Sequence, residues 1–219
     1  MVKDEALWIA EIIKDNDIYF PLLNLGSSTK RFREIEQPWV DEIIFNPLFA
    51  KGKQVVHCDL KKEEGVDLVG NIFDKEFAEQ LRCMNFKSIL CSNVLEHIPS
   101  ADINSFCEAI EFIAHSGTYI LVSVPNIYPY HRDPIDTKFR PDVNGVAKLF
   151  SQCQLVKGTI HIAKETHFST LIKKPYTCLL TIKNWLIPRF GIKEWKKRCT
   201  DIPNVFKKYR YTWVLLRKL

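Results

Sequence analysis

Small or polar side chains follow several short apolar runs of the sequence, at the point where each run ends. The run Leu22-Leu23-Asn24-Leu25 is followed by Gly26-Ser27-Ser28, whose small residues allow a ligand to approach the backbone closely. The run that ends at Cys58 is followed by Asp59, an acceptor-only carboxylate that suits two vicinal ribose hydroxyls. These two segments therefore indicate a nucleoside-binding site.

Two further runs end in groups that suit a base and its neighbours. Residues 66–69 are followed by Gly70-Asn71-Ile72, where a carboxamide able to pair with an adenine amino group stands beside an apolar residue able to flank the ring. Residues 88–91 are followed by a serine and an asparagine. The candidate ligand-binding residues are Asn24, Gly26, Ser27, Ser28, Asp59, Asn71, Ile72, Ser92 and Asn93.

Two histidines follow predicted strands and are candidate catalytic residues. His97 follows the fourth apolar run, and His131 follows the fifth in a loop rich in aromatic and polar residues that suits a sugar or another polyol. A histidine with its ordinary pKa of about 6.5 is a natural general base for a hydroxyl acceptor. Each also has a structural interpretation: His97 as a partner of Glu96 or of a backbone carbonyl, and His131 as part of a surface loop.

The elements that must position these residues alternate along the chain. In the first predicted helix the apolar residues form one stripe, and Glu5 is left for solvent. Strands that alternate with helices predict an open, largely parallel sheet, in which ligands bind beyond the carboxyl ends of the strands. Strands are predicted over 20–25, 54–58, 66–70, 88–91, 118–124, 154–162 and 211–216, and helices over 4–14, 39–48, 74–83, 101–115, 142–150 and 176–187.

The same segments resemble the class I S-adenosylmethionine-dependent methyltransferases, over nearly the whole chain from about Leu22 to Leu216. The segment Ser123 to Asp142 also resembles small bacterial methyltransferases often associated with surface glycan pathways. The four segments that carry the main likeness are Leu22 to Ser28 for the first glycine motif, Val55 to Asp59 for the acidic strand end, Gly70-Asn71-Ile72 for the adenine-contacting turn, and Asn93-Val94-Leu95-Glu96-His97-Ile98 for the "LEH" signature.

This resemblance implies a fold, a cofactor and a reaction. The fold is a Rossmann-like, seven-stranded, mostly parallel sheet with one antiparallel edge strand and helices on both faces. The expected organisation is a single domain over 1–219, with 164–208 inserted between the last two strands. The implied cofactor is S-adenosylmethionine, and the implied reaction is methyl transfer to an oxygen or nitrogen of a small-molecule or glycan-like acceptor.

The glycine motif departs from the usual family pattern. Gly26 is its only glycine, and Asn24, Ser28 and Lys30 occupy the other places. The Lys30 ammonium would repel a sulfonium if it pointed inward, and this objection disappears if Lys30 faces solvent. No metal is predicted, because Asn93 stands where metal-holding relatives have an acid.

Composition sets broad limits on the protein. Of 219 residues, 46% are hydrophobic and 26% are charged, which is typical of a globular chain with a sizeable core. Every apolar run falls short of the roughly 20 residues of a bilayer span, and the N-terminus does not resemble a signal peptide. The seven cysteines are odd in number and form no C-x-x-C pair, so neither a disulfide framework nor a zinc site is expected. The expected location is the cytoplasm, with peripheral contact at the inner face of the membrane as an option.

Positive charge is concentrated near the C-terminus. Residues 164–219 contain 14 Lys and Arg against three Asp and Glu, although the net charge of the whole chain is only +5. Segment 176–187 is predicted to be amphipathic, with one apolar face formed by Cys178, Leu179, Ile182, Trp185 and Leu186. This segment and the lysines of 173–198 suit an anionic membrane surface, and a packed helical insertion is the alternative. The same charge also fits an RNA methyltransferase, which is favoured less because no RNA-binding signature is present. A non-catalytic cofactor-binding scaffold is a third class, and the sequence leaves the oligomeric state open.

Overall fold

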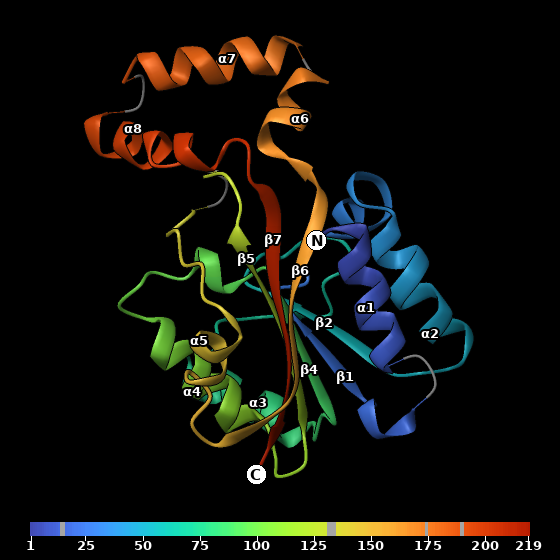
Figure 1. The fold of residues 1–219 in the computed structure, drawn as a ribbon. Helices are drawn as coiled ribbons and strands as arrows, with labels where there is room; N and C mark the ends of the chain where they lie inside the picture. Colours follow the sequence, from blue (N-terminus) through green and yellow to red (C-terminus); the bar gives the residue numbers. More distant parts are fainter. Residues whose placement is uncertain (14–15, 131–134, 174, 189–190) are drawn as a thin grey trace.

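The computed structural model describes residues 1–13, 16–130, 135–173, 175–188 and 191–219 (Figure 1). Within these ranges, seven strands form one sheet in the order β3-β2-β1-β4-β5-β7-β6. Neighbours from β3 to β5 pair in parallel, and β7 is antiparallel to both β5 and β6. The predicted fold class is confirmed. The antiparallel strand is β7, and it lies next to the edge of the sheet, where β6 is the edge strand. The strands are β1 (Leu22–Leu25), β2 (Val55–Asp59), β3 (Leu68–Val69), β4 (Ser88–Ser92), β5 (Tyr119–Ile127), β6 (Cys153–Thr166) and β7 (Lys208–Lys218).

Helices cover both faces of the sheet, which explains why the central strands are largely buried and rich in apolar residues (Figure 1). Leu22 and Leu23 are adjacent in β1 and fully buried, yet they belong to different hydrophobic cores. One core lies beneath α1 and α2, and the other beneath α3, α4 and α5. The helices are α1 (Lys3–Ile13), α2 (Asn46–Ala50), α3 (Lys75–Cys83), α4 (Ile103–Ile113), α5 (Val143–Ala147), α6 (His167–Ile172), α7 (Pro175–Leu186) and α8 (Ile192–Cys199).

The segment before α2 differs from the regular helix predicted over 39–48. Wide π-type turns, η2 (Phe32–Glu36) and η3 (Asp41–Phe45), precede α2. Pro47 has no N–H to donate to the carbonyl of Ile43, so a regular α-helix through this position would lose a hydrogen bond and bring the proline ring against that carbonyl. A wide turn that ends before Pro47 avoids both costs.

Two features of the topology determine where a ligand can bind. The order of strands reverses between β1 and β4, so the loops after these strands diverge and leave a crevice at their carboxyl ends. Helices α6, α7 and α8 lie between β6 and β7 in the chain and form a lobe that projects beyond the sheet (Figure 1). The described residues contain no helix long and apolar enough to cross a membrane.

Candidate active site

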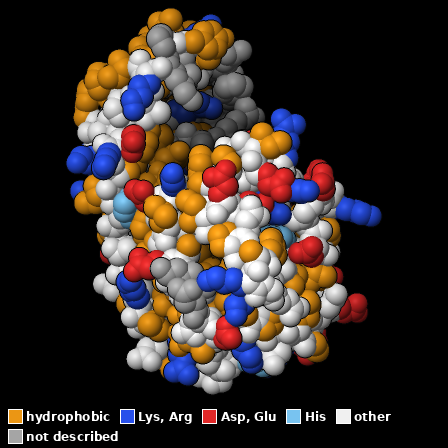
Figure 2. Space-filling view, turned by 90° about the vertical axis from the view of Figure 1, so that its right-hand side faces the viewer, with side chains coloured by type: hydrophobic (Ala, Val, Ile, Leu, Met, Phe, Trp, Pro, Cys, Tyr) orange, Lys and Arg blue, Asp and Glu red, His pale blue; other side chains and the backbone are white. Residues whose placement is uncertain are grey.

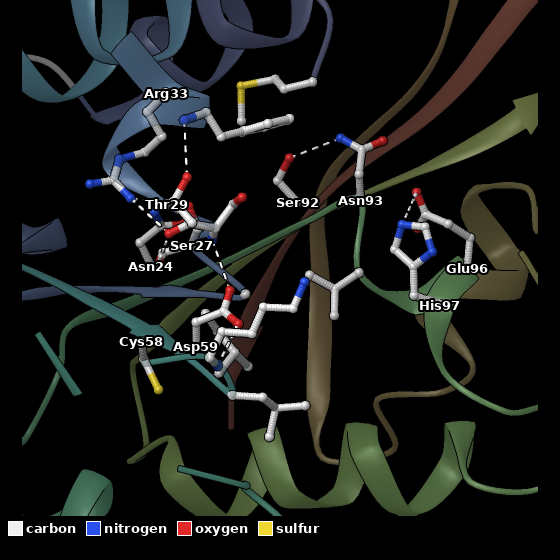
Figure 3. Close-up of a pocket in the computed structure, with 18 of the residues that line it drawn as sticks. Asn24, Ser27, Thr29, Arg33, Cys58, Asp59, Ser92, Asn93, Glu96 and His97 are labelled. Carbon is white, nitrogen blue, oxygen red and sulfur yellow. Dashed lines mark hydrogen bonds and ion pairs between the residues drawn. The ribbon is translucent and has the colours of Figure 1, made fainter. Parts of the chain in front are cut away.

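A cavity of about 950 Å³ opens at the carboxyl ends of β1, β2 and β4, where the strand order reverses (Figure 3). Its volume lies at the upper end of the usual range for small-molecule sites. The topology therefore brings together segments that are far apart in the sequence. The predicted site residues that line the cavity are Asn24, Gly26, Ser27, Ser28, Asp59, Asn71, Ile72, Ser92, Asn93 and His97. The other predicted residue, His131, lies outside the described residues.

The turn after β1 packs directly against the loop after β4. Gly26 has a φ of +71°, and a Cβ atom at this position would lie 2.5 Å from Val94 Cγ2. The backbone N–H groups of Gly26 and Ser27 both donate to the Cys58 carbonyl, at 2.8 and 3.0 Å. Only glycine tolerates both the left-handed backbone and the close contact, so this residue sets how near the turn after β1 comes to the loop after β4.

Asp59 is held at the end of β2 by the backbone. One carboxylate oxygen accepts from the Ser28 N–H at 2.8 Å, and the other accepts from the Lys61 N–H at 3.2 Å. The first of these bonds joins the β2 end to the turn after β1 (Figure 3). A carboxylate has about four lone-pair positions, so two bonds fix its orientation and leave acceptor capacity for a ligand.

Arg33, which the sequence analysis did not single out, is a buried clamp on the same turn. Its guanidinium donates to the carbonyls of Ser27 and Ser28 at 3.2 and 3.1 Å, and it pairs with the buried Asp41 at 3.2 Å. Burial raises the pKa of Asp41, and the Arg33 charge opposes that shift. Arg33 lies in the charged run 30–34, where nothing in the residue pattern distinguishes it from its exposed neighbours.

The side-chain amide of Asn24 forms a hydrogen bond within the protein. Its Nδ2 lies 3.0 Å from His57 Nδ1, and both side chains are buried. Burial, assisted by the Arg33 charge, lowers the pKa of His57 to about 4, so the ring is neutral at pH 7 and Nδ1 accepts from the amide. Asn24 lines the cavity as predicted, but this hydrogen bond gives its amide nitrogen a structural role.

A buried carboxylate from the N-terminal helix fixes the residues after β4. Glu5 of α1 is fully buried, and the prediction that it faces solvent is wrong. It accepts from Ser92 Oγ at 2.6 Å, from Asn93 Nδ2 at 3.1 Å to each oxygen, and from Ser123 Oγ. Helical periodicity placed Glu5 beside the apolar stripe of α1. Only the packing of α1 over β4 and β5 brings its carboxylate within hydrogen-bond distance of Ser92, Asn93 and Ser123. Ser92 and Asn93 therefore line the cavity, and their side chains are held in place by hydrogen bonds to Glu5.

Glu96 and His97 form a second polar group on the cavity wall (Figure 3). Glu96 is 1% exposed, and burial raises its pKa to about 8. Its Oε1 lies 3.9 Å from His97 Nε2, and its Oε2 has no hydrogen-bond partner among the described residues. His97 Nδ1 lies 2.5 Å from the Ile135 carbonyl, which can only accept, so Nδ1 carries the proton and Nε2 carries the lone pair of the neutral ring.

Comparisons with known proteins agree with this architecture. No family model and no curated protein matches the sequence. Among solved structures, coclaurine N-methyltransferase bound to N-methylheliamine and SAH aligns over 99% of this chain and 70% of its own, with a TM-score of 0.55 and 13% identity. A SAM-dependent methyltransferase from Archaeoglobus fulgidus aligns over 99% and 95%, with a TM-score of 0.51 and 11% identity. The chain has the fold of the class I methyltransferases.

The cyclase SpnF shares this methyltransferase fold. It aligns over 99% of this chain and 80% of its own, with a TM-score of 0.53 and 12% identity. One fold thus supports different chemistries, so function must be argued from the residues of the cavity.

The cavity residues fit an adenosyl cofactor of the kind this fold binds. Lys30 pairs with Glu64 at 3.3 Å, its side chain is 45% exposed, and it does not line the cavity, so the objection raised by its charge does not hold. Ile72 is buried in the wall, and the exposed side chains of Leu60 and Phe73 lie at the same end. Leu60 and Phe73 were not predicted as site residues, although they directly follow Asp59 and Ile72 in the chain.

No cluster of three or more His, Cys, Asp or Glu side chains able to hold a metal ion occurs in the part of the chain that the structure describes.

Proposed function

We propose that this protein transfers a methyl group from S-adenosylmethionine to an oxygen or nitrogen of a small-molecule or glycan-like acceptor. The observation that carries the proposal is the fixed Asp59 carboxylate, which shares one cavity with the Glu96–His97 pair. When bound, the cofactor supplies an electrophilic methyl group on a positively charged sulfur.

Asp59 would hold the cofactor through its ribose. Its carboxylate is already oriented by Ser28 and Lys61, so its remaining lone pairs can accept from two vicinal hydroxyls without a large loss of side-chain entropy. Asn71 lies at the same end of the cavity, where its amide can pair with the adenine. Leu60, Ile72 and Phe73 would flank the base with apolar surface.

Charge around the cavity is compatible with a sulfonium. The Arg33 guanidinium is balanced by Asp41 and bonded to carbonyls, and the Lys30 ammonium lies outside with Glu64. Asp59 supplies negative charge on the wall itself, and Glu5 supplies it directly behind Ser92 and Asn93. Two further cations, the exposed Lys61 and the Met1 ammonium, also line the cavity, and the Met1 ammonium donates to Gln37 Oε1. The described residues therefore place both acids and cations around the cavity, with Asp59 on the wall itself.

His97 would act as the general base for the acceptor. The Ile135 carbonyl fixes the tautomer and leaves the lone pair on Nε2, beside Glu96. A positioned base contributes roughly 10² to 10⁴ in rate, and alignment of the reactants contributes roughly 7 to 11 kcal/mol. His131 is retained as the second candidate base. Tyr128 and Tyr211 also line the cavity, and aromatic walls beside polar groups suit a sugar ring, which supports a glycan-like acceptor.

Calorimetric titration with S-adenosylmethionine and with S-adenosylhomocysteine tests the cofactor site. We expect Asp59→Ala to weaken binding about a hundredfold or more, because two hydrogen bonds to a charged acceptor are worth about 3 kcal/mol or more. Glu63→Gln, an exposed acid four residues away, is the matched control and should bind as the native protein does. His97→Gln should bind the cofactor normally and lower methyl transfer. Absence of heat and of thermal stabilisation with both ligands would refute the proposal.

A further inference from the structure

Helix α7 presents an apolar face to solvent. Tyr176, Leu179, Ile182 and Leu186 are 75%, 68%, 43% and 74% exposed, and they are three or four residues apart. Residues at this spacing lie on one side of a helix. Figure 1 shows α7 as the outermost element of the lobe, and Figure 2 shows hydrophobic side chains gathered at the same end of the molecule with Lys or Arg beside them.

The side of α7 that faces the protein carries both apolar and polar residues, and Cys178 and Leu180 are half-buried on it. Thr181 and Asn184 are half-buried there, and the buried Asn184 Oδ1 has no hydrogen-bond partner among the described residues. Trp185 packs on this side too, where its carbonyl accepts from Trp195 Nε1 of α8 at 2.7 Å. The sequence analysis grouped Trp185 with Cys178, Leu179, Ile182 and Leu186 on one apolar face. In the structure Cys178 and Trp185 are half-buried, and the other three are exposed.

Helix α7 therefore leaves a large part of its apolar surface in solvent, whereas a surface helix usually turns its apolar stripe toward the core. The lobe has a second exposed apolar group: Phe168 and Ile172 of α6 are exposed, and the Phe168 ring packs on exposed Phe206 with centroids 5.0 Å apart. Exposed apolar side chains concentrated on one lobe in this way indicate an interaction site.

The charge of the lobe selects the partner. Between residues 167 and 207 the sequence has nine Lys and Arg against Glu194 and Asp201. Asp201 is buried and paired with Lys138 at 2.6 Å, so it does not offset this charge at the outer surface. The exposed lysines of the lobe are Lys173, Lys183, Lys193, Lys196 and Lys207.

Apolar side chains flanked by lysines match an anionic bilayer, where the apolar face enters the boundary of the acyl chains and the ammonium groups contact the head groups. The exposed apolar residues of α7 are mostly aliphatic. Single-stranded nucleic acid, in contrast, is held by stacking on aromatic rings. The surface therefore fits lipid better than RNA.

The lobe is also tied to the loop that borders the cavity. The Tyr130 N–H donates to the Asp201 carboxylate at 2.5 Å, and the Tyr128 ring packs on Tyr209 with centroids 4.9 Å apart. Tyr128 itself lines the cavity. We propose that the outer face of α6 and α7 docks on an anionic membrane surface. If the proposed function holds, docking brings the part of the cavity lined by Tyr128, where a glycan-like acceptor would lie, close to substrates presented at that surface.

Vesicle sedimentation tests the docking without reference to activity. We expect the protein of residues 1–219 to sediment with vesicles of phosphatidylglycerol and phosphatidylcholine, and to remain in solution with phosphatidylcholine alone. The double variant Leu179→Glu/Leu186→Glu should lose binding about tenfold or more, since it replaces two apolar contacts with charges that anionic lipid repels. Ile35→Glu, at an exposed apolar residue of η2, is the matched control and should bind normally.

Thermal unfolding and cofactor titration of each variant show that the fold is intact. Failure of cofactor binding would refute the proposed function and leave the docking proposal standing. Three results would overturn the docking: equal sedimentation with both kinds of vesicle or with neither, tight binding of an RNA oligonucleotide that the double variant loses, or a dimer in light scattering that the double variant converts to a monomer.

Discussion

Replacing Glu5 is the sharpest test of how the site is held. In Glu5→Ala the side chains of Ser92, Asn93 and Ser123 lose a common charged acceptor in a fully buried position. A hydrogen bond to a charged group is worth about 1.5 to 3 kcal/mol, and a buried donor left unsatisfied costs about 1 to 3 kcal/mol. Asn93 Nδ2 already lies 3.0 Å from Ser92 Oγ, so part of the loss is recovered locally. We expect the free energy of unfolding to fall by about 3 to 5 kcal/mol.

Equilibrium unfolding in urea, followed by tryptophan fluorescence, measures this loss. Glu11→Ala is the matched control, because Glu11 is the same residue type on the same helix and is exposed. We expect that variant to lie within about 0.5 kcal/mol of the native protein. Since Ser92 and Asn93 line the cavity, Glu5→Ala should also weaken cofactor binding at temperatures where it remains folded. A Glu5→Ala protein as stable as Glu11→Ala would show that the carboxylate does not organise the loop after β4.

Two further substitutions test the turn after β1 and the buried acid. Gly26→Ala and Gly52→Ala both place a methyl group at a positive φ, but of these two positions only Gly26 has a neighbour within 4 Å. We expect Gly52→Ala to lower the free energy of unfolding by about 1 kcal/mol, and Gly26→Ala to lower it by about 1 to 3 kcal/mol more. Equal losses of stability in the two variants would contradict the packing of Gly26 against Val94. The pKa of Glu96 in the folded state is about 8, above its unfolded value near 4.5, so the native state binds the extra proton between these values and stability falls as pH rises through this window. The slope from this group approaches about 1.4 kcal/mol per pH unit, and Glu96→Gln should remove it; an unchanged slope in urea unfolding from pH 5.5 to 8 would show that Glu96 is ionised throughout.

Much of the cavity was predictable because parallel sheets follow a strict rule of position. Once strands were assigned to 20–25, 54–58 and 88–91, the residues after them had to meet at one edge, and Gly26, Asp59 and His97 do so. The identity of each residue then suggested its chemistry: a turn that admits only glycine, a carboxylate at a strand end, and a histidine in a loop.

The partners of those residues were not predictable, since they come from positions with no local signal. Glu5 lies 87 residues before Ser92, and Arg33 sits in a charged run whose other members face solvent. Trp185 belongs to the same apolar pattern as Leu186, but one is packed against α8 and the other is exposed. Periodicity finds an apolar stripe, and it does not say which side of a helix the rest of the chain covers.

The amino-acid sequence alone predicted the alternation of strands and helices, the parallel sheet and the residues at its carboxyl edge. These features depend on the spacing of apolar residues along the chain and on a general rule of topology. Tertiary structure alone decided which buried charges hold that edge in place and which face of α7 is left open, because a carboxylate such as Glu5 finds its donors only when distant strands have packed beneath it.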